Sequence, residues 1–224
     1  MDTSPDIAAR RTHLLAQLAA AAQQAGRNPS DITLVAVSKR QPDESLVAAL
    51  EAGQRVFGEN RVQEAYAHWG ERRAAIPDLQ LRLIGPLQSN KAHEAVELFD
   101  VIETLDRDKL AGALRKAMTA TGRTPRLLVQ VNTGEEPQKA GIAPVELPDF
   151  LARVRDQHGL AVEGLMCIPP TAEPAGLHFA LLARLARENG LSELSMGMSA
   201  DFETAIALGA TSVRIGTAFF GDRL

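Results

Sequence analysis

The sequence predicts an α/β protein built on a (β/α)8 TIM barrel, with one extra helix at the N-terminus. Eight short apolar runs alternate along the chain with longer helical patterns, and strands that alternate with helices pair in parallel. The chain has 224 residues, close to the roughly 250 that such barrels usually contain. Eight strands are also more than the roughly six of a usual doubly wound open sheet.

The first element is an amphipathic helix predicted over residues 6–24. Its apolar side chains, among them Ile7, Leu14 and Leu18, recur at spacings of four and seven, and Gly26 follows as a helix-closing residue. No linker, low-complexity stretch or change of composition divides the rest of the chain. We therefore expect a single domain over residues 1–224, in which residues 1–30 carry a helix that packs on the barrel.

The other elements follow from the alternation of apolar runs with helical patterns. The predicted strands are residues 32–38, 55–57, 80–84, 101–103, 126–131, 162–166, 193–195 and 212–215. The predicted helices are residues 43–52, 60–75, 90–98, 107–121, 145–157, 174–189 and 200–208. Several of these helices are closely followed by a glycine, which indicates where they end.

Composition argues against several classes of function. The chain carries 24 Lys and Arg against 28 Asp and Glu, a net charge of −4, and has no basic run that could follow a phosphodiester backbone, so nucleic acid is not an expected partner. No apolar segment is long enough to span a membrane. A single cysteine, Cys167, and an N-terminus without a signal-peptide pattern predict a cytoplasmic protein. The five histidines show no metal-ligand spacing, so no metal site is expected.

Lys39 is the residue that points most directly to chemistry. It follows the strand predicted at residues 32–38, and chemistry in such barrels collects at the C-terminal ends of the strands. Burial lowers the pKa of a lysine toward the reactive amine, which can form a Schiff base with a carbonyl compound. The alternative is a lysine whose stem packs on the rim while its ammonium reaches water. Lys91, at the start of a helix, and Lys139, in a polar loop, are both expected to be solvated.

The loops after the last two strands carry the parts of a phosphate site. Gly197 and Ser199 follow the seventh strand, and barrels often hold a phosphate at this pair of loops. Gly216 and Thr217 follow the eighth strand, so that backbone N–H groups and two hydroxyls could together cradle a phosphate dianion. The alternative for Ser199 is a helix N-cap, supported by the acidic Asp201. Agreement between two loops favours the phosphate site.

Other polar residues near the strand ends have two interpretations each. Arg214 lies within the last strand, where a permanent charge needs an acid or a polar ligand, and an ion pair across the barrel and a ligand contact are equally open. Asn60 and Asn90 each open a predicted helix and are expected first as N-caps, with ligand contact as the alternative. Cys167 is expected to be a small buried residue without an activating neighbour.

Six blocks of sequence extend this pattern over nearly the whole chain. They are Val35-Ala-Val-Ser-Lys39, Phe57-Gly-Glu-Asn60 with Gln63-Glu64, Ile84-Gly-Pro-Leu-Gln-Ser-Asn-Lys91, Gly164-Leu-Met-Cys-Ile-Pro169, Leu194-Ser-Met-Gly-Met-Ser-Ala-Asp-Phe-Glu203 and Val213-Arg-Ile-Gly-Thr217. In this order they resemble the pyridoxal phosphate homeostasis protein family, whose fold is like the N-terminal barrel domain of alanine racemase.

The resemblance implies a cofactor, pyridoxal 5′-phosphate (PLP), and the residues that hold it. Lys39 is then expected to bind PLP covalently as an internal aldimine, Asn60 to line the pocket, and Arg214 to lie near the pyridine nitrogen, where a positive neighbour disfavours ring protonation. The phosphate is expected on Ser199, Gly216 and Thr217. The family binds, buffers and delivers PLP, so the resemblance implies no catalytic residue, with apo PLP-dependent enzymes as candidate recipients and a monomer or weak dimer as the assembly.

Two other functions remain open from the sequence. A PLP-dependent amino-acid racemase of the same barrel would share Lys39 but needs an acid or base on each face of its substrate, and alanine racemases supply the second as a tyrosine positioned with help from another domain. The one tyrosine here is Tyr66, and no further domain is expected after the eighth strand, so we expect no sustained racemisation. A barrel that binds another phosphorylated metabolite, with Lys39 as a counter-ion, is the third possibility.

Overall fold

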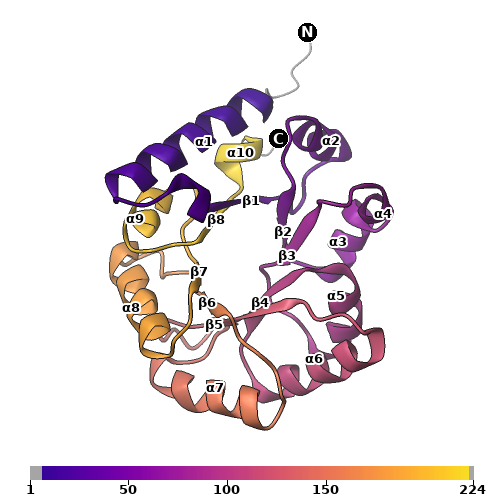
Figure 1. Ribbon diagram of the computed structural model, residues 1–224, viewed down its shortest axis with the longest axis vertical. Helices are drawn as coiled ribbons and strands as arrows, with labels where there is room; N and C mark the ends of the chain where they lie inside the picture. The colour runs from indigo at the N-terminus through magenta and orange to yellow at the C-terminus, as the bar shows by residue number, and fades with distance from the viewer. Residues whose placement is uncertain (1–6, 222–224) are drawn as a thin grey trace.

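Eight parallel strands close on themselves in the computed structural model, which describes residues 7–221 (Figure 1). The strands are β1 (Thr33–Val37), β2 (Val56–Glu59), β3 (Gln80–Leu83), β4 (Val101–Leu105), β5 (Arg126–Gln130), β6 (Gly164–Met166), β7 (Glu193–Ser195) and β8 (Ser212–Ile215). Each strand pairs with the next, and β1 pairs with β8, so the sheet has no open edge. The predicted barrel is confirmed.

Helices cover the outside of this barrel (Figure 1). They are α1 (Ile7–Gln24), α2 (Asp43–Glu51), α3 (Val62–Trp69), α4 (Arg72–Ala75), α5 (Ala92–Leu98), α6 (Asp108–Thr121), α7 (Leu147–Asp156), α8 (Ala175–Glu188), α9 (Phe202–Ala207) and α10 (Thr217–Phe220), with 3-10 turns η1 (Pro29–Asp31), η2 (Ser89–Lys91) and η3 (Pro144–Glu146). The extra helix α1 lies against α2, α9 and α10. Its predicted first residue, Asp6, lies outside the described residues.

Several predicted elements differ from the structure in their bounds or continuity. The helix predicted over residues 60–75 is two helices, α3 and α4, which are separated at Gly70 and Glu71 although both residues keep helical dihedral angles. Strands β2 and β4 each run two residues beyond their predicted ends, since polar residues there are buried instead of leaving the sheet. The short helix α10 was not predicted, because four residues show no helical period.

The main hydrophobic core lies between the strands and the surrounding helices. Phe57 of β2 and Trp69 of α3 illustrate it, because both are fully buried and their ring centroids lie 4.4 Å apart. Alternate residues of each strand point to opposite faces, so the side chains next to these apolar ones point into the barrel. The strands therefore supply two separate environments, one under the helices and one inside the barrel.

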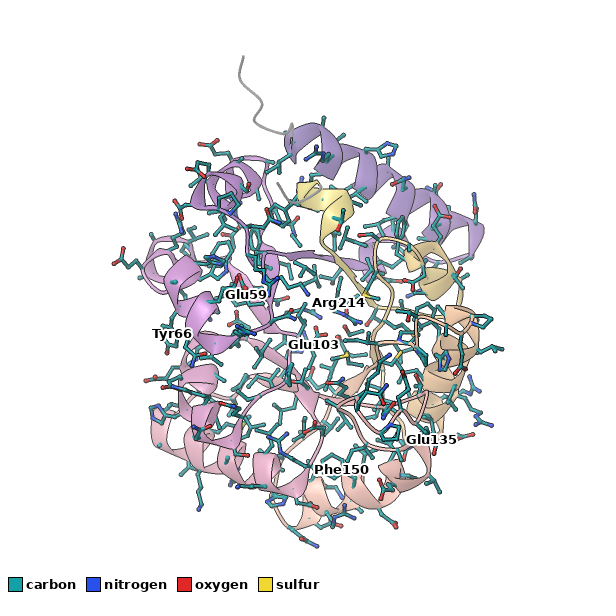
Figure 2. All side chains as sticks on the ribbon, turned by 180° about the vertical axis from the view of Figure 1, so that it is seen from behind. Glu59, Tyr66, Glu103, Glu135, Phe150 and Arg214 are labelled. Carbon is teal, nitrogen blue, oxygen red and sulfur yellow. The ribbon has the colours of Figure 1, made fainter. Side chains whose placement is uncertain are left out.

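The inside of the barrel holds a chain of polar contacts, defined here as the interior network. Arg82 of β3 forms an ion pair with Glu103 of β4 (3.1 Å), and both side chains are almost fully buried. The other oxygen of Glu103 accepts a hydrogen bond from Ser195 of β7 (2.5 Å), and Ser195 accepts one from Arg214 of β8 (2.7 Å). Figure 2 shows Glu103 and Arg214 near the centre of the barrel. Contacts thus cross the barrel from β3 to β8.

We predict that Arg82→Met lowers the free energy of unfolding by about 3–5 kcal/mol, because Glu103 is then left buried without its counter-charge. Guanidinium unfolding monitored by circular dichroism measures the change. The control is Arg155→Met, which removes an exposed, solvent-screened ion pair with Asp156 and should leave the denaturant midpoint almost unchanged. Equal losses in the two variants would show that the interior pair does not constrain the fold.

Candidate functional site at the barrel mouth

The residues predicted from sequence lie along one arc of the barrel mouth. Strands β7, β8, β1 and β2 are consecutive neighbours around the closed sheet, and the predicted residues lie at or beyond their C-terminal ends. Ser199 follows β7, Arg214 lies in β8, Gly216 and Thr217 follow it, Lys39 follows β1, and Asn60 follows β2. Parallel pairing places these ends on the same side of the barrel. The structure therefore brings all six candidates to one end of the molecule.

The loops after β7 and β8 meet at Ser199. Its hydroxyl oxygen accepts a hydrogen bond from the backbone N–H of Ala218 (3.4 Å), a residue of α10. The N-cap position of helix α9 is Asp201 instead, and its carboxylate accepts a hydrogen bond from the N–H of Met198 in the preceding loop (2.6 Å). The N-cap interpretation of Ser199 is therefore wrong. Its hydroxyl links the two loops, and the phosphate interpretation of Ser199 stays a prediction.

Gly216 lies next to open space at the mouth, and no neighbouring atom is close enough to exclude a side chain there. A Cβ built on Gly216 would meet nothing closer than Val37 Cβ at 3.6 Å, although its backbone, with φ −104° and ψ −82°, lies outside the helical and extended regions. Gly197 differs, because its φ is +95° and a Cβ there would lie 2.6 Å from Ala205 Cβ. The glycine at 197 serves the fold, whereas the one at 216 leaves backbone open at the mouth. Exposed backbone N–H groups of this kind are able to bind an anion.

Arg214 is buried and held in place by two hydrogen bonds. Its guanidinium donates to Ser195 Oγ (2.7 Å) and to the carbonyl oxygen of Cys167 (2.8 Å). Both of these acceptors are neutral, and the nearest acid of the interior network, Glu103, lies beyond Ser195. The structure thus shows no direct ion pair of Arg214 with an acid among the residues described. A fixed cation beside the mouth favours a polar or anionic ligand.

Lys39 is half-buried and lies between two residues that are tied to β2 and α3. The residue before it, Ser38, is fully buried and donates a hydrogen bond to Glu59 Oε1 (2.6 Å). Glu59 also accepts a hydrogen bond from Trp69 Nε1 (3.0 Å) and lies 2.8 Å from His68 Nδ1. Sequence reasoning missed Glu59 as a functional residue, although its charge at the end of a buried strand was the available signal.

The same region contains a group that could hold a metal ion. Ligand atoms of Glu59, Glu64 and His68 lie within 4.8 Å of one another, although no metal site was expected from the sequence. One oxygen of Glu59 already accepts hydrogen bonds, and one of Glu64 accepts the N–H of Arg40. The second oxygen of Glu59 is buried and has no hydrogen-bond partner among the described residues. Because the first oxygen of Glu59 and the Glu64 oxygen already accept hydrogen bonds, the group acts first as a hydrogen-bonded anchor.

Asn60 lines a cavity of about 770 Å³ beside the arc, formed by the loops after β2, β3, β4 and β5. It does not cap a helix, because α3 is capped at Arg61, and Asn90 lies inside η2, so both N-cap predictions are wrong. A Cβ on Gly85 would lie only 2.2 Å from the Asn60 carbonyl oxygen. This close approach holds Asn60 at the edge of the mouth.

Three other residues considered from the sequence, Lys91, Lys139 and Cys167, have ion pairs or burial that explain their positions. Lys91 and Lys139 are partly exposed and pair with Glu94 and Glu136, which agrees with their predicted solvation. Cys167 is fully buried, and desolvation raises the pKa of its thiol to about 12, as expected for an unactivated residue.

Tyr66 lies on the outside of the barrel, away from the mouth (Figure 2). It belongs to α3, its side chain is exposed, and its hydroxyl donates a hydrogen bond to the carbonyl oxygen of Glu94 in α5 (3.3 Å). This position does not allow Tyr66 to face a ligand held by Lys39.

In the part of the chain that the structure describes, no helix combines the length and apolar character needed to cross a bilayer.

Comparisons with known proteins match this architecture and its motifs. The family model for the N-terminal domain of alanine racemase matches residues 11–224. Pyridoxal phosphate homeostasis proteins of Pseudomonas aeruginosa and Escherichia coli K12 are 43% and 39% identical, over 97% of this chain and 96% and 97% of theirs. The structure of PipY of Synechococcus elongatus with PLP bound is 40% identical, covers 96% of this chain and 100% of its own, and superposes with a TM-score of 0.82.

His68 generates a prediction about pH. The hydrogen bond to Glu59 raises the pKa of His68 above its usual value of 6.5, with burial opposing the shift. A raised pKa means that the contact stabilises the fold fully below about pH 6.5, and that this contribution is lost as pH rises through the folded-state pKa. We predict that the stability lost in His68→Gln shrinks from pH 6.5 upward. Urea unfolding across this range measures it, with the exposed His93→Gln as control; a pH-independent difference would contradict the prediction.

Proposed function

Since the chain belongs to the pyridoxal phosphate homeostasis protein family, we propose that it binds PLP at the barrel mouth and serves as a carrier and buffer of the cofactor. The observation that carries the proposal is that the candidate residues lie together at the C-terminal ends of β7, β8, β1 and β2. Neighbouring strands supply an amine at Lys39, a cradle at Gly216 and a fixed cation at Arg214. These are the groups that an aldehyde, a phosphate and a ring nitrogen would meet.

In this proposal each residue of the arc has one role. Lys39 holds the cofactor aldehyde as a Schiff base, which forms reversibly with an amine. The phosphate lies against the hydroxyls of Ser199 and Thr217 and the open backbone at Gly216. Arg214 faces the pyridine nitrogen and disfavours its protonation, which makes the ring a weaker electron sink. Asn60 borders the pocket from the β2 side.

The openness of the mouth supports a carrier. Lys39, Ser199 and Gly216 are half-buried, and Thr217 is exposed, so the proposed ligand would remain reachable from solvent. Reachability allows release as well as uptake. We propose that the protein works in the cytoplasm, as a monomer or weak dimer, and that apo PLP-dependent enzymes receive the cofactor.

We predict that Lys39→Ala loses the visible imine band that the wild-type protein retains after incubation with PLP and dialysis. Borohydride should add PLP covalently to the Lys39 peptide in the wild type, measured by mass spectrometry, because only an imine is trapped. The exposed Lys116→Ala is the matched control and should behave as the wild type. No band and no adduct in the wild type would indicate another phosphorylated ligand, with Lys39 as a counter-ion.

The racemase alternative makes a separate prediction. Racemisation needs an acid or base on each face of the substrate, Tyr66 lies outside the barrel, and the pKa of Cys167 is raised to about 12. We predict that the purified PLP-loaded protein does not sustain racemisation of L-alanine, measured by chiral chromatography. Sustained turnover that Lys39→Ala abolishes would contradict the proposed carrier.

A further inference from the structure

The turn that presents Lys39 contains a backbone conformation that side chains disfavour. Arg40, the next residue, has φ of +57°, in the left-handed region that favours glycine. Only one other non-glycine residue in the described range 7–221, Glu135, has a positive φ. Such a conformation persists only where surrounding contacts hold it. The contacts that hold Arg40 therefore also set the direction in which the chain leaves Lys39.

The carboxylates of Glu59 and Glu64 accept hydrogen bonds from this turn, one on each side of Lys39. On the N-terminal side, Ser38 Oγ donates a hydrogen bond to Glu59 Oε1 (2.6 Å) at the end of β2. On the C-terminal side, the backbone N–H of Arg40 donates to Glu64 of α3. Hydrogen bonds to charged acceptors are shorter and stronger than neutral ones. The turn is thus fixed by groups from outside its own strand.

Glu59 is itself held firmly. Its side chain is fully buried, Trp69 Nε1 donates to it (3.0 Å), and His68 Nδ1 lies 2.8 Å from it. Glu64 belongs to the same helix, α3, as these two aromatic residues. A single rigid body made of the end of β2 and of α3 therefore carries both acceptors.

We propose that Glu59 and Glu64 are positioning residues, which fix the Lys39 turn so that its amine meets the aldehyde of a PLP whose phosphate lies at the β7 and β8 loops. This inference rests on the proposed function. A lysine side chain has four rotatable bonds, so the amine finds one place only if its backbone origin is fixed. Fixing that origin in advance removes an ordering cost that binding would otherwise bear.

The test compares four variants for PLP affinity and for the fraction of Lys39 trapped by borohydride. Glu64→Ala removes the acceptor of the Arg40 N–H and should weaken PLP binding about tenfold, the scale of one lost hydrogen bond to a charged group. Glu64→Gln keeps an oxygen acceptor and should stay within about threefold of the wild type. Glu188→Ala, which removes an exposed carboxylate on α8, is the matched control and should change nothing.

The fourth variant separates positioning from general damage. Arg40→Gly combined with Glu64→Ala should recover part of the lost affinity, because glycine adopts a φ of +57° without the steric cost that arginine bears, although it does not fix the turn as the Glu64 carboxylate does. Unchanged binding in Glu64→Ala overturns the proposal. A loss that Arg40→Gly does not reduce at all also overturns it, since the carboxylate would then act on something other than the turn.

A readout without the cofactor keeps this proposal distinct from the proposed function. In the apoprotein, amide hydrogen exchange at Arg40 should be faster in Glu64→Ala than in the wild type and in Glu64→Gln. Equal exchange in all three overturns the positioning role. Faster exchange together with a wild-type protein that traps no PLP would leave the anchor in place and refute the PLP site instead.

Discussion

The pairing of β1 with β8 is the constraint on which the site depends. It sets Val35 opposite Arg214, so residues nearly 180 positions apart in sequence lie side by side. Without this closure, the lysine after β1 and the glycine after β8 would lie on separate edges of an open sheet. Closure also removes the unpaired strand edges that such a sheet would expose. One set of backbone hydrogen bonds therefore completes the barrel and assembles its mouth.

Closure also explains why the barrel interior tolerates charge. The chain of contacts from Arg82 through Glu103 and Ser195 to Arg214 pairs or hydrogen-bonds each buried polar group with its neighbour. Buried charges are costly when isolated and acceptable when they are paired and hydrogen-bonded. The network keeps the Arg214 guanidinium in a fixed place. Stability of the interior and orientation of a residue at the mouth thus share the same contacts.

Much of the fold could be predicted from local patterns, and so could the position of the candidate site residues at the strand ends, because short segments of sequence determine where each strand ends. Lys39, Ser199 and Gly216 all lie where the rule for strand ends places them. The anchors could not be found in this way, since Glu59 and Glu64 act on the turn after β1 through the packing of β2 and α3 against it. N-cap predictions for Asn60 and Asn90 failed because helices α3 and α5 begin later than the sequence pattern suggests.

The contact between the first and last helices has a consequence for biosynthesis. Arg10 of α1 donates a hydrogen bond to the carbonyl oxygen of Phe220 in α10 (2.8 Å), and the two helices lie side by side in Figure 1. A nascent chain on the ribosome can form neither this contact nor the β1–β8 pair until its last strand has emerged. The arc of candidate residues at the mouth is therefore complete only in chains whose synthesis has passed both β8 and α10.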